Sequence, residues 1–432
     1  MQRGQRWTWI VWLLLAAVTP FLLFPGGWRT LALVILPVIL VGNRVAMGCF
    51  FRRTPYDMAI ALLLLMVLVS LYATFDVEFS LPKITGTLLG VTTLYVLVNF
   101  AYSLSRFELA VLGLQVAIVT FTGFLLVGTQ WGGKVPVLQQ LGSMIPQIIK
   151  GLPGAEEGFH PNEVGGALTW LVFLPLTTGL GVWRQRHSAF TAIIACILLG
   201  VSATMAGVLL LTQSRSAWIG TIVGIGTLAF VAGRWGKVLV ALGLITALAT
   251  VLVIGPAQAR QIWEEGSLEE LGAISNISLE GRIEVWSRAL YGIQDFPFTG
   301  MGIGTFRRVV PVLYPLFLVS PDQDIGHAHN EWLQVGVDLG IPGLVAYLAI
   351  QGLGLILAYK AFRSSGPPLI RWTAGGTLAG LIAHGVYGLT DAVALGAKPG
   401  IWYWILLGLA AASWELVIAK PNHPQRVSKS HD

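Results

Sequence analysis

The run HAHNEWLQVGVDLGIPGL, from His327 to Leu344, is the part of the sequence that says most about chemistry. It places two histidines, an amide and two carboxylates at the edge of an apolar stretch whose glycines allow close packing. A neutral imidazole near pH 7 can accept a proton from a hydroxyl group, and a neighbouring amide or carboxylate can fix its tautomer. The alternative is that His327 and His329 only hydrogen-bond the loop backbone, as many half-buried histidines do.

Composition places these residues in a membrane protein. Hydrophobic residues make up 55% of the 432 and charged residues 11%, against about 25% charged residues in soluble chains. A mean hydropathy of +0.73, with 16 Trp and 51 Gly, fits helices solvated by lipid. The composition excludes disordered and collagen-like chains, and two cysteines cannot build a disulfide framework. The net charge of +6 matters through its distribution along the chain, and nucleic acid is not an expected partner.

Apolar runs of about 17 to 22 residues, long enough to cross a hydrocarbon core, predict an all-α integral membrane protein with about twelve transmembrane helices. We place the spans at 8–25, 28–43, 56–74, 84–103, 108–128, 164–182, 189–212, 216–232, 238–255, 340–359, 373–390 and 400–418. The first span follows Arg3 and Arg6 without a small-residue cleavage site, so we expect it to be retained.

The distribution of Lys and Arg predicts the orientation of these spans. An even number of spans puts both termini on one side, and sixteen of the 27 cations fall there. The short loops of the other side hold four: Arg29, Lys83, Arg215 and Lys398. By the positive-inside rule, both termini are expected in the cytoplasm.

Two segments on the other side are too long to be simple connections. The first, at about 128–163, lies within residues 1–255, which carry the first nine spans. The second, 256–339, is expected to form a long extracytoplasmic helical loop, and 340–432 holds the last three spans and a cytoplasmic tail. Long ordered loops are where function concentrates. In the second segment we expect a solvated helix and an amphipathic helix, marked respectively by Glu264, Glu265, Glu269 and Glu270 and by Ile283, Trp286, Leu290 and Ile293.

Three motifs around the histidines resemble the O-antigen ligase and O-antigen polymerase superfamily. The His329-Asn330 pair, followed after nine residues by Gly340-Ile341-Pro342-Gly343, is similar to its His-Asn and Gly-x-x-Gly signature. Residues 281–286 and 295–304 resemble its Arg-x-x-x-Trp and Pro-x-x-Gly-x-Gly-x-Gly stretch, and residues 212–218 resemble its Ser-Arg motif. The motifs cover roughly residues 200–360, and the topology of the remainder also agrees.

The resemblance implies a GT-C-like bundle in the bacterial inner (plasma) membrane, with an extracytoplasmic active site. It implies transfer of a glycan from an undecaprenyl-diphosphate carrier to a hydroxyl of a lipid-core or glycan acceptor, with membrane lipids around the chain. Direct attack on such a donor inverts the anomeric centre. No cofactor and no metal are implied. The motifs are shared by ligases and polymerases, of which we slightly prefer the ligase.

Site residues follow from the same resemblance. His329 is the expected general base, or the group that positions the acceptor hydroxyl, with His327, Asn330 and Glu331 in support. Cleavage of the anomeric carbon–oxygen bond leaves a growing charge on the diphosphate, which arginine forks match bidentately. Arg215 is the first candidate for this role and also a catalytic one, although an arginine at a helix end can simply snorkel to the interface.

Arg282 is the second candidate for the diphosphate and Arg288 the third. Six residues separate them, which is about 240° around a helix, so they cannot point the same way. One is expected to face the site and the other solvent or an acid. Glu284, four residues before Arg288, is well placed for that ion pair.

Two further patterns leave alternatives open. The glycines Gly300, Gly302 and Gly304 could offer backbone amides to phosphate, or could form a tight turn. The set Asp322, Asp324, His327 and His329 could ligate a divalent cation, whereas the resemblance points to a metal-independent site.

Lesser candidates lie elsewhere on the expected outer side. His160, Asn162 and Glu163 could line a groove, or Asn162 could cap a helix. His384 and Asp391 are polar residues near the end of the eleventh span.

The main rival function is a transporter of small anions. The superfamily has a branch labelled as putative bicarbonate transporters, which lacks the His-Asn pair. A transporter would need polar groups near mid-membrane, whereas most of the spans are nearly uncharged at their centres. A catalytically silent scaffold in envelope assembly is the third possibility.

Overall fold

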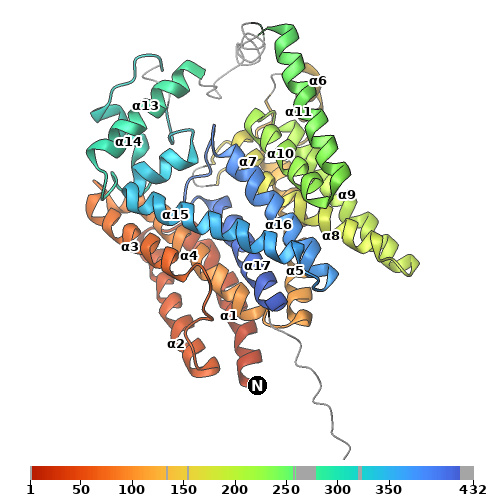
Figure 1. Cartoon of the computed structure of the whole chain (residues 1–432). Helices are drawn as coiled ribbons and strands as arrows, with labels where there is room; N and C mark the ends of the chain where they lie inside the picture. Colours follow the sequence, from red (N-terminus) through yellow and green to blue (C-terminus); the bar gives the residue numbers. More distant parts are fainter. Residues whose placement is uncertain are drawn as a thin grey trace, which may run out of the picture.

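The computed structural model is a bundle of α-helices in which residues 2–132, 135–152, 155–255, 258, 279–319 and 324–418 are described. No strand occurs within these ranges. Figure 1 shows the bundle with a smaller group of helices at one end, formed by residues 279–313, which we call the site end.

The chain begins with helices that run back and forth through the bundle: α1 (Gln2–Leu23), η1 (Gly27–Val34), α2 (Ile35–Met47), α3 (Asp57–Ala73), α4 (Val77–Phe100) and α5 (Leu104–Gly128). The middle of the chain forms α6 (Pro136–Ser143), α7 (Pro161–Leu171), α8 (Phe173–Arg184), α9 (Ala189–Leu211), α10 (Arg215–Ala232) and α11 (Arg234–Ile254). The C-terminal third forms α13 (Leu279–Asp295), α14 (Phe306–Leu313), α15 (Glu331–Arg363), α16 (Pro368–Tyr387), η2 (Lys398–Gly400) and α17 (Ile401–Ile418).

A helix stands at each of the twelve predicted spans, and the protein has the architecture of a multi-pass membrane protein. Within the described residues, ten helical segments are long and apolar enough to cross a bilayer. Asp57–Ala73 is shorter, with 17 residues, and Pro368–Tyr387 is not among the ten. The expected number of twelve spans is therefore not confirmed.

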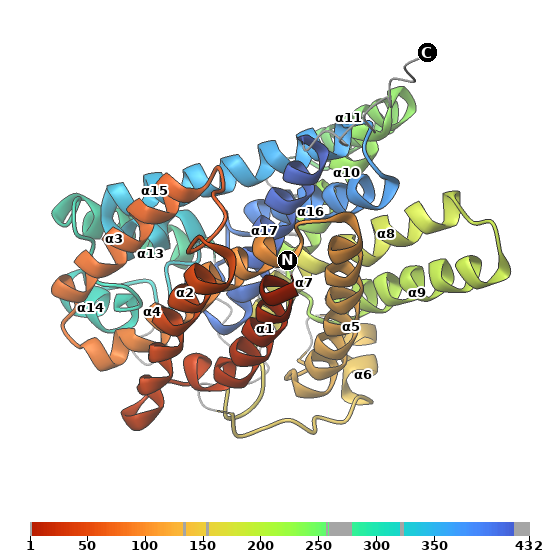
Figure 2. The same cartoon turned by 90° about the horizontal axis from the view of Figure 1, so that it is seen from below.

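The centre of the bundle is built from α4, α7, α15, α16 and α17, which carry most of the buried side chains. Small residues let these helices approach closely, as is usual in membranes. A Cβ added at Gly380 would clash with the Trp170 carbonyl, and one at Gly90 would clash with the Trp404 ring. Seen from below in Figure 2, α7 and α17 lie inside, whereas α1, α5, α9 and α11 lie around them.

A second, smaller core forms the site end. Val285 and Ala289 of α13 pack with Met301, Phe306 and Val310. The expected amphipathic helix is thus present as α13, although the buried face differs, because Ile283 and Leu290 are 53% and 47% exposed. The expected solvated helix with Glu264, Glu265, Glu269 and Glu270 lies outside the described residues.

The two cores meet at a break in α15. Gly340 has φ 70° and ψ −178° inside this 33-residue helix, and the amide of Ile341 donates to the Pro297 carbonyl at 2.7 Å. The predicted span 340–359 begins at this break. The residues before Gly340 contact both cores, because Val337 packs in the smaller core and Val335 and Leu339 pack in the bundle.

Candidate active site

The start of α15 is bound to the segment that follows α16. Asn330 caps α15, with its side-chain oxygen accepting from the Leu333 amide at 3.0 Å, as expected of an N-cap asparagine. Its side-chain amide donates to the Leu389 carbonyl at 2.9 Å. The amide of Glu331 donates to the Gly388 carbonyl at 2.8 Å. These bonds bring Asp391, 62 residues downstream of His329, to the two histidines.

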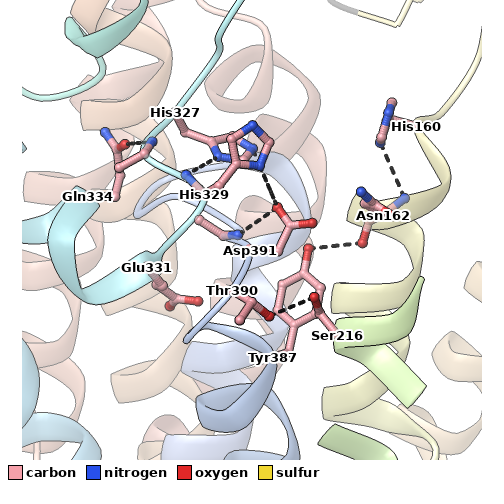
Figure 3. A network of polar contacts seen from close by, with 12 residues as sticks. His160, Asn162, Ser216, His327, His329, Glu331, Gln334, Tyr387, Thr390 and Asp391 are labelled. Atoms are coloured by element: carbon pink, nitrogen blue, oxygen red, sulfur yellow. Dashed lines mark hydrogen bonds and ion pairs between the residues drawn. The ribbon is translucent and has the colours of Figure 1, made fainter. Parts of the chain in front are cut away.

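His327, His329 and Asp391 form a compact cluster, which we call the histidine–aspartate cluster (Figure 3). Nδ1 of His329 lies 3.4 Å from Oδ1 of Asp391, and Nε2 of His327 lies 3.9 Å from the same oxygen. The two imidazole rings meet edge to face, with centroids 4.5 Å apart. With Nδ1 of His329 facing a carboxylate, its Nε2 is the nitrogen left to accept a proton.

The backbone fixes the tautomer of His327. The amide of His329 donates to His327 Nδ1 at 3.1 Å, so the proton of a neutral His327 ring sits on Nε2 and points to Asp391. A ring in this state has no lone pair on Nε2 for a cation, although the three side chains are close enough together to surround one. Of the other acids expected near a metal, Asp324 is paired with Arg307 at 3.0 Å, and Asp322 lies outside the described residues.

Burial and charge set the ionisation of the cluster. Burial, followed by the neighbouring His329, lowers the pKa of His327 to about 3, so this ring is neutral at pH 7. Burial raises the pKa of Asp391, but His329, His327 and Arg282 together outweigh it and hold this pKa below its usual range. Asp391 is therefore a carboxylate at neutral pH, beside two imidazoles.

Arg282 contacts the same segment, and Arg215 lies near it. Nη1 of Arg282, on α13, donates to the Thr390 carbonyl at 2.6 Å. Arg215 is the first residue of α10, and the next residue, Ser216, hydrogen-bonds the Thr390 hydroxyl at 2.7 Å. Arg215 and Arg282 are also close enough to interact electrostatically. Two adjacent cations beside a polar cluster form a place where an anion would be stabilised.

Arg288 has other partners. Its guanidinium lies 3.1 Å from Glu284 Oε1 and donates to the Pro315 carbonyl at 2.9 Å. Glu284 also accepts from the amides of Phe317 and Leu318. The expected ion pair with Glu284 is confirmed, and Arg288 joins α13 to the segment after α14. These partners favour a structural role for Arg288 over the expected contact with diphosphate, which stays a prediction.

The glycine run is packed against its surroundings. Gly300, Gly302 and Gly304 all have positive φ, at 66°, 100° and 76°. A Cβ at Gly300 would lie 2.5 Å from the Asp338 carbonyl oxygen, and one at Gly302 would lie 2.7 Å from Thr74 Cα. The amide of Gly304 donates to Asp338 Oδ1 at 3.1 Å. These contacts favour the tight turn over a phosphate-binding loop.

A buried network lies beneath the cluster. Oε2 of Glu331 lies 2.7 Å from His384 Nε2, and its Oε1 accepts from the Tyr347 hydroxyl. Nδ1 of His384 faces the Gly166 carbonyl at 3.1 Å, which can only accept, so Nδ1 carries a proton. The ring also stacks on Trp170, with centroids 3.6 Å apart. Glu331 thus anchors the start of α15 to His384 of α16, which in turn contacts α7.

The start of α7 lies opposite the cluster in Figure 3. Nδ1 of His160 accepts from the Asn162 amide at 3.3 Å, so His160, and not Asn162, caps the helix. The Tyr387 hydroxyl donates to the Asn162 carbonyl at 3.0 Å. The structure thus brings the 128–163 segment close to the 387–391 segment.

Sequence reasoning gave too little weight to Asp391 and did not single out Thr390 or Tyr387. The available signal was an acid directly after a span, in a short connection that ends at Lys398. What the sequence could not supply was the partner of that acid, because the contact with His329 depends on how α15 and α16 pack.

Comparison with known families identifies one region of the chain. Residues 200–348 match the family model described as O-Antigen ligase. This range contains Arg215, Arg282 and His329, whereas Asp391 lies beyond it. No curated protein matched the chain.

Proposed function

We propose, on the premise that residues 200–348 belong to the O-antigen ligase family, that this protein transfers a glycan from an undecaprenyl-diphosphate carrier to the hydroxyl of a lipid-core or glycan acceptor. The observation that carries the proposal is the 3.4 Å contact between His329 and Asp391, next to Arg282, which donates to Thr390 and interacts electrostatically with Arg215. The match to the family supports a membrane enzyme of the glycosyl-transfer type.

In the proposed reaction His329 acts as the general base. Asp391 keeps the Nδ1 proton of His329 in place, so Nε2 takes the proton of the acceptor hydroxyl as its oxygen attacks the anomeric carbon. His327 stays neutral, and its Nε2 proton also faces Asp391. The carboxylate then stabilises the imidazolium that forms on His329.

The leaving group departs on the other side of the reacting carbon. The bond between the anomeric carbon and the diphosphate oxygen breaks, and the electron pair leaves with the diphosphate. Arg215 and Arg282 bind this group and stabilise its growing negative charge. Attack from one face and departure from the other invert the anomeric centre. The chemistry uses no cofactor, and the proton on Nε2 of His327 supports a reaction without a metal ligated there.

The site end is proposed to face away from the cytoplasm. The bias of Lys and Arg toward the loops on the N-terminal side supports cytoplasmic termini in a bacterial inner membrane. In that orientation α13, α14 and the start of α15 form an extracytoplasmic region above the spans. The lipid-linked donor then enters from the bilayer and presents its diphosphate at the membrane surface.

A transfer assay tests the proposal. The full chain in nanodiscs is given undecaprenyl-diphosphate-linked glycan, candidate acceptors and a chelator. We expect product from the wild type, and none from His329→Ala or Arg215→Ala. The matched controls are His187→Ala and Arg186→Ala, which change exposed residues between α8 and α9 and should keep full activity. Normal transfer by either of the first two variants would refute the assigned roles.

The same assay separates the ligase from the polymerase. A ligase moves existing chains onto the acceptor, so the product sizes repeat those of the donor. A polymerase joins donor glycans to each other and gives a ladder that lengthens with time. Uptake of small anions into liposomes, without any transfer, would instead support the transporter.

A further inference from the structure

Two side chains on one face of α13 donate hydrogen bonds to backbone carbonyls on both sides of the histidine–aspartate cluster. Arg282 and Trp286 are four residues apart and so lie above one another on the same face of the helix. Nη1 of Arg282 donates to the Thr390 carbonyl at 2.6 Å. Nε1 of Trp286 donates to the His329 carbonyl at 3.1 Å. One carbonyl belongs to the residue before Asp391, and the other to His329 itself.

The backbone of His329 needs this support. Its φ is 45°, in the left-handed region that residues with a Cβ rarely adopt. Such a conformation persists where surrounding contacts over-determine it. The contacts are the His329 amide on His327 Nδ1 and its carbonyl on Trp286. The second one comes from a helix outside the segment that carries the cluster.

We infer that Trp286 is a positioning residue, which acts through the His329 carbonyl to hold His329 Nδ1 against Asp391. This inference rests on the proposed function, in which that contact supports the general base. Trp286 is half-buried on the helix that also carries Arg282. The orientation of the proposed base and the position of a proposed diphosphate ligand are therefore set by one rigid element.

A kinetic comparison tests the role of the indole N–H. Trp286→Phe keeps an aromatic ring and removes the N–H donor together with part of the indole ring system. We expect kcat to fall about tenfold, the factor that one ordinary hydrogen bond supplies, with the KM for the donor unchanged. The matched control is Trp131→Phe, which removes a comparable bond from Trp131 Nε1 to the Leu126 carbonyl at 3.0 Å. This control should keep the wild-type kcat, and an unchanged kcat in Trp286→Phe would overturn the inference.

A double-mutant cycle separates positioning from a general structural role. If Trp286 acts through the contact between His329 and Asp391, Trp286→Phe has no further effect once Asp391→Asn has removed the carboxylate. A simple loss of packing would instead lower kcat by the same factor in both backgrounds, and that result would refute the inference. Thermal midpoints of all variants in nanodiscs are measured alongside, and those of the Trp286 and Trp131 variants should agree.

A readout that needs no substrate keeps this test distinct from the proposed function. In the protein labelled with ¹⁵N-indole tryptophan, the Trp286 signal is assigned by its absence in Trp286→Phe. We expect its N–H to exchange with solvent more than tenfold slower than a free indole. Fast exchange overturns the inference even if transfer is observed. A protected N–H without transfer would instead count against the proposed reaction and leave the positioning contact in place.

Discussion

Replacing Asp391 by Asn tests the proposed proton transfer most directly, because it removes the charge and keeps the shape. When His329 accepts the proton, a positive ring lies 3.4 Å from the Asp391 oxygen. At an effective dielectric constant of about 20, two unit charges at this distance attract by about 5 kcal/mol. The side chains are only 12% and 3% exposed, so solvent screens them little. Since about 1.4 kcal/mol is a factor of ten in rate, kcat should fall by about 10³-fold.

Single-turnover transfer in nanodiscs with saturating donor measures this loss. Apparent donor affinity should change little, because Arg215 and Arg282 remain. The matched control is Asp324→Asn, which removes a carboxylate 64% exposed and paired with Arg307. Exposed pairs of this kind contribute about 0 to 1 kcal/mol, so this variant should stay within a few-fold of the wild type. An Asp391→Asn protein that keeps more than a tenth of the wild-type kcat would show that the carboxylate does not assist His329.

Three other predictions concern stability and the separation of roles. The folded chain holds the pKa of His327 at about 3, below its ordinary value of 6.5, so on acidification the unfolded chain takes up a proton first. The free energy of unfolding should therefore fall by about 2 kcal/mol between pH 7 and pH 5. Over the same pH change, the thermal midpoint of His327→Gln should fall less than that of the wild type. Gly340→Ala should lower the thermal midpoint markedly, because Gly340 has φ 70° and a Cβ would lie 2.8 Å from the Pro297 carbonyl oxygen. The control Gly352→Ala should keep the wild-type midpoint, because its Cβ would meet no atom within 4 Å. Equal midpoints for the two variants would show that the break in α15 is not required. Arg288→Ala should lower the free energy of unfolding by about 1 to 3 kcal/mol, because its partners lose their hydrogen bonds, and should leave the donor KM unchanged. A raised donor KM would show that Arg288 binds the diphosphate after all.

Much of the fold could be predicted from the sequence, because bilayer thickness imposes a length on apolar runs. The boundaries shifted where local chemistry decided them. The fourth helix begins at Val77 and not at residue 84, because the Asp76 side chain accepts from the amides of Glu78 and Phe79. The predicted span 28–43 starts as a 3₁₀ helix, and 164–182 is divided between α7 and α8.

The candidate site could be predicted only incompletely. Motifs pointed to His329, Arg215 and Arg282, which the structure brings to the segment around Thr390 and Asp391. Helical spacing predicted the ion pair between Arg288 and Glu284, but it could not show that the amides of residues 317 and 318 also bind Glu284. Nor could the motifs reveal the contact between Trp286 and His329, which joins residues 43 positions apart and leaves no periodic pattern.

The exposed position of α11 affects how the protein adapts to the thickness of its membrane. None of the 21 residues of α11 is buried, and its main described neighbour is α10. At 1.5 Å per residue it is about 32 Å long, close to the thickness of a hydrocarbon core of about 30 Å. In a thinner bilayer such a helix relieves hydrophobic mismatch by tilting. Because α15, α16 and α7 are fixed by buried contacts, this tilt can be taken up at the edge of the bundle, without moving His329 relative to Asp391.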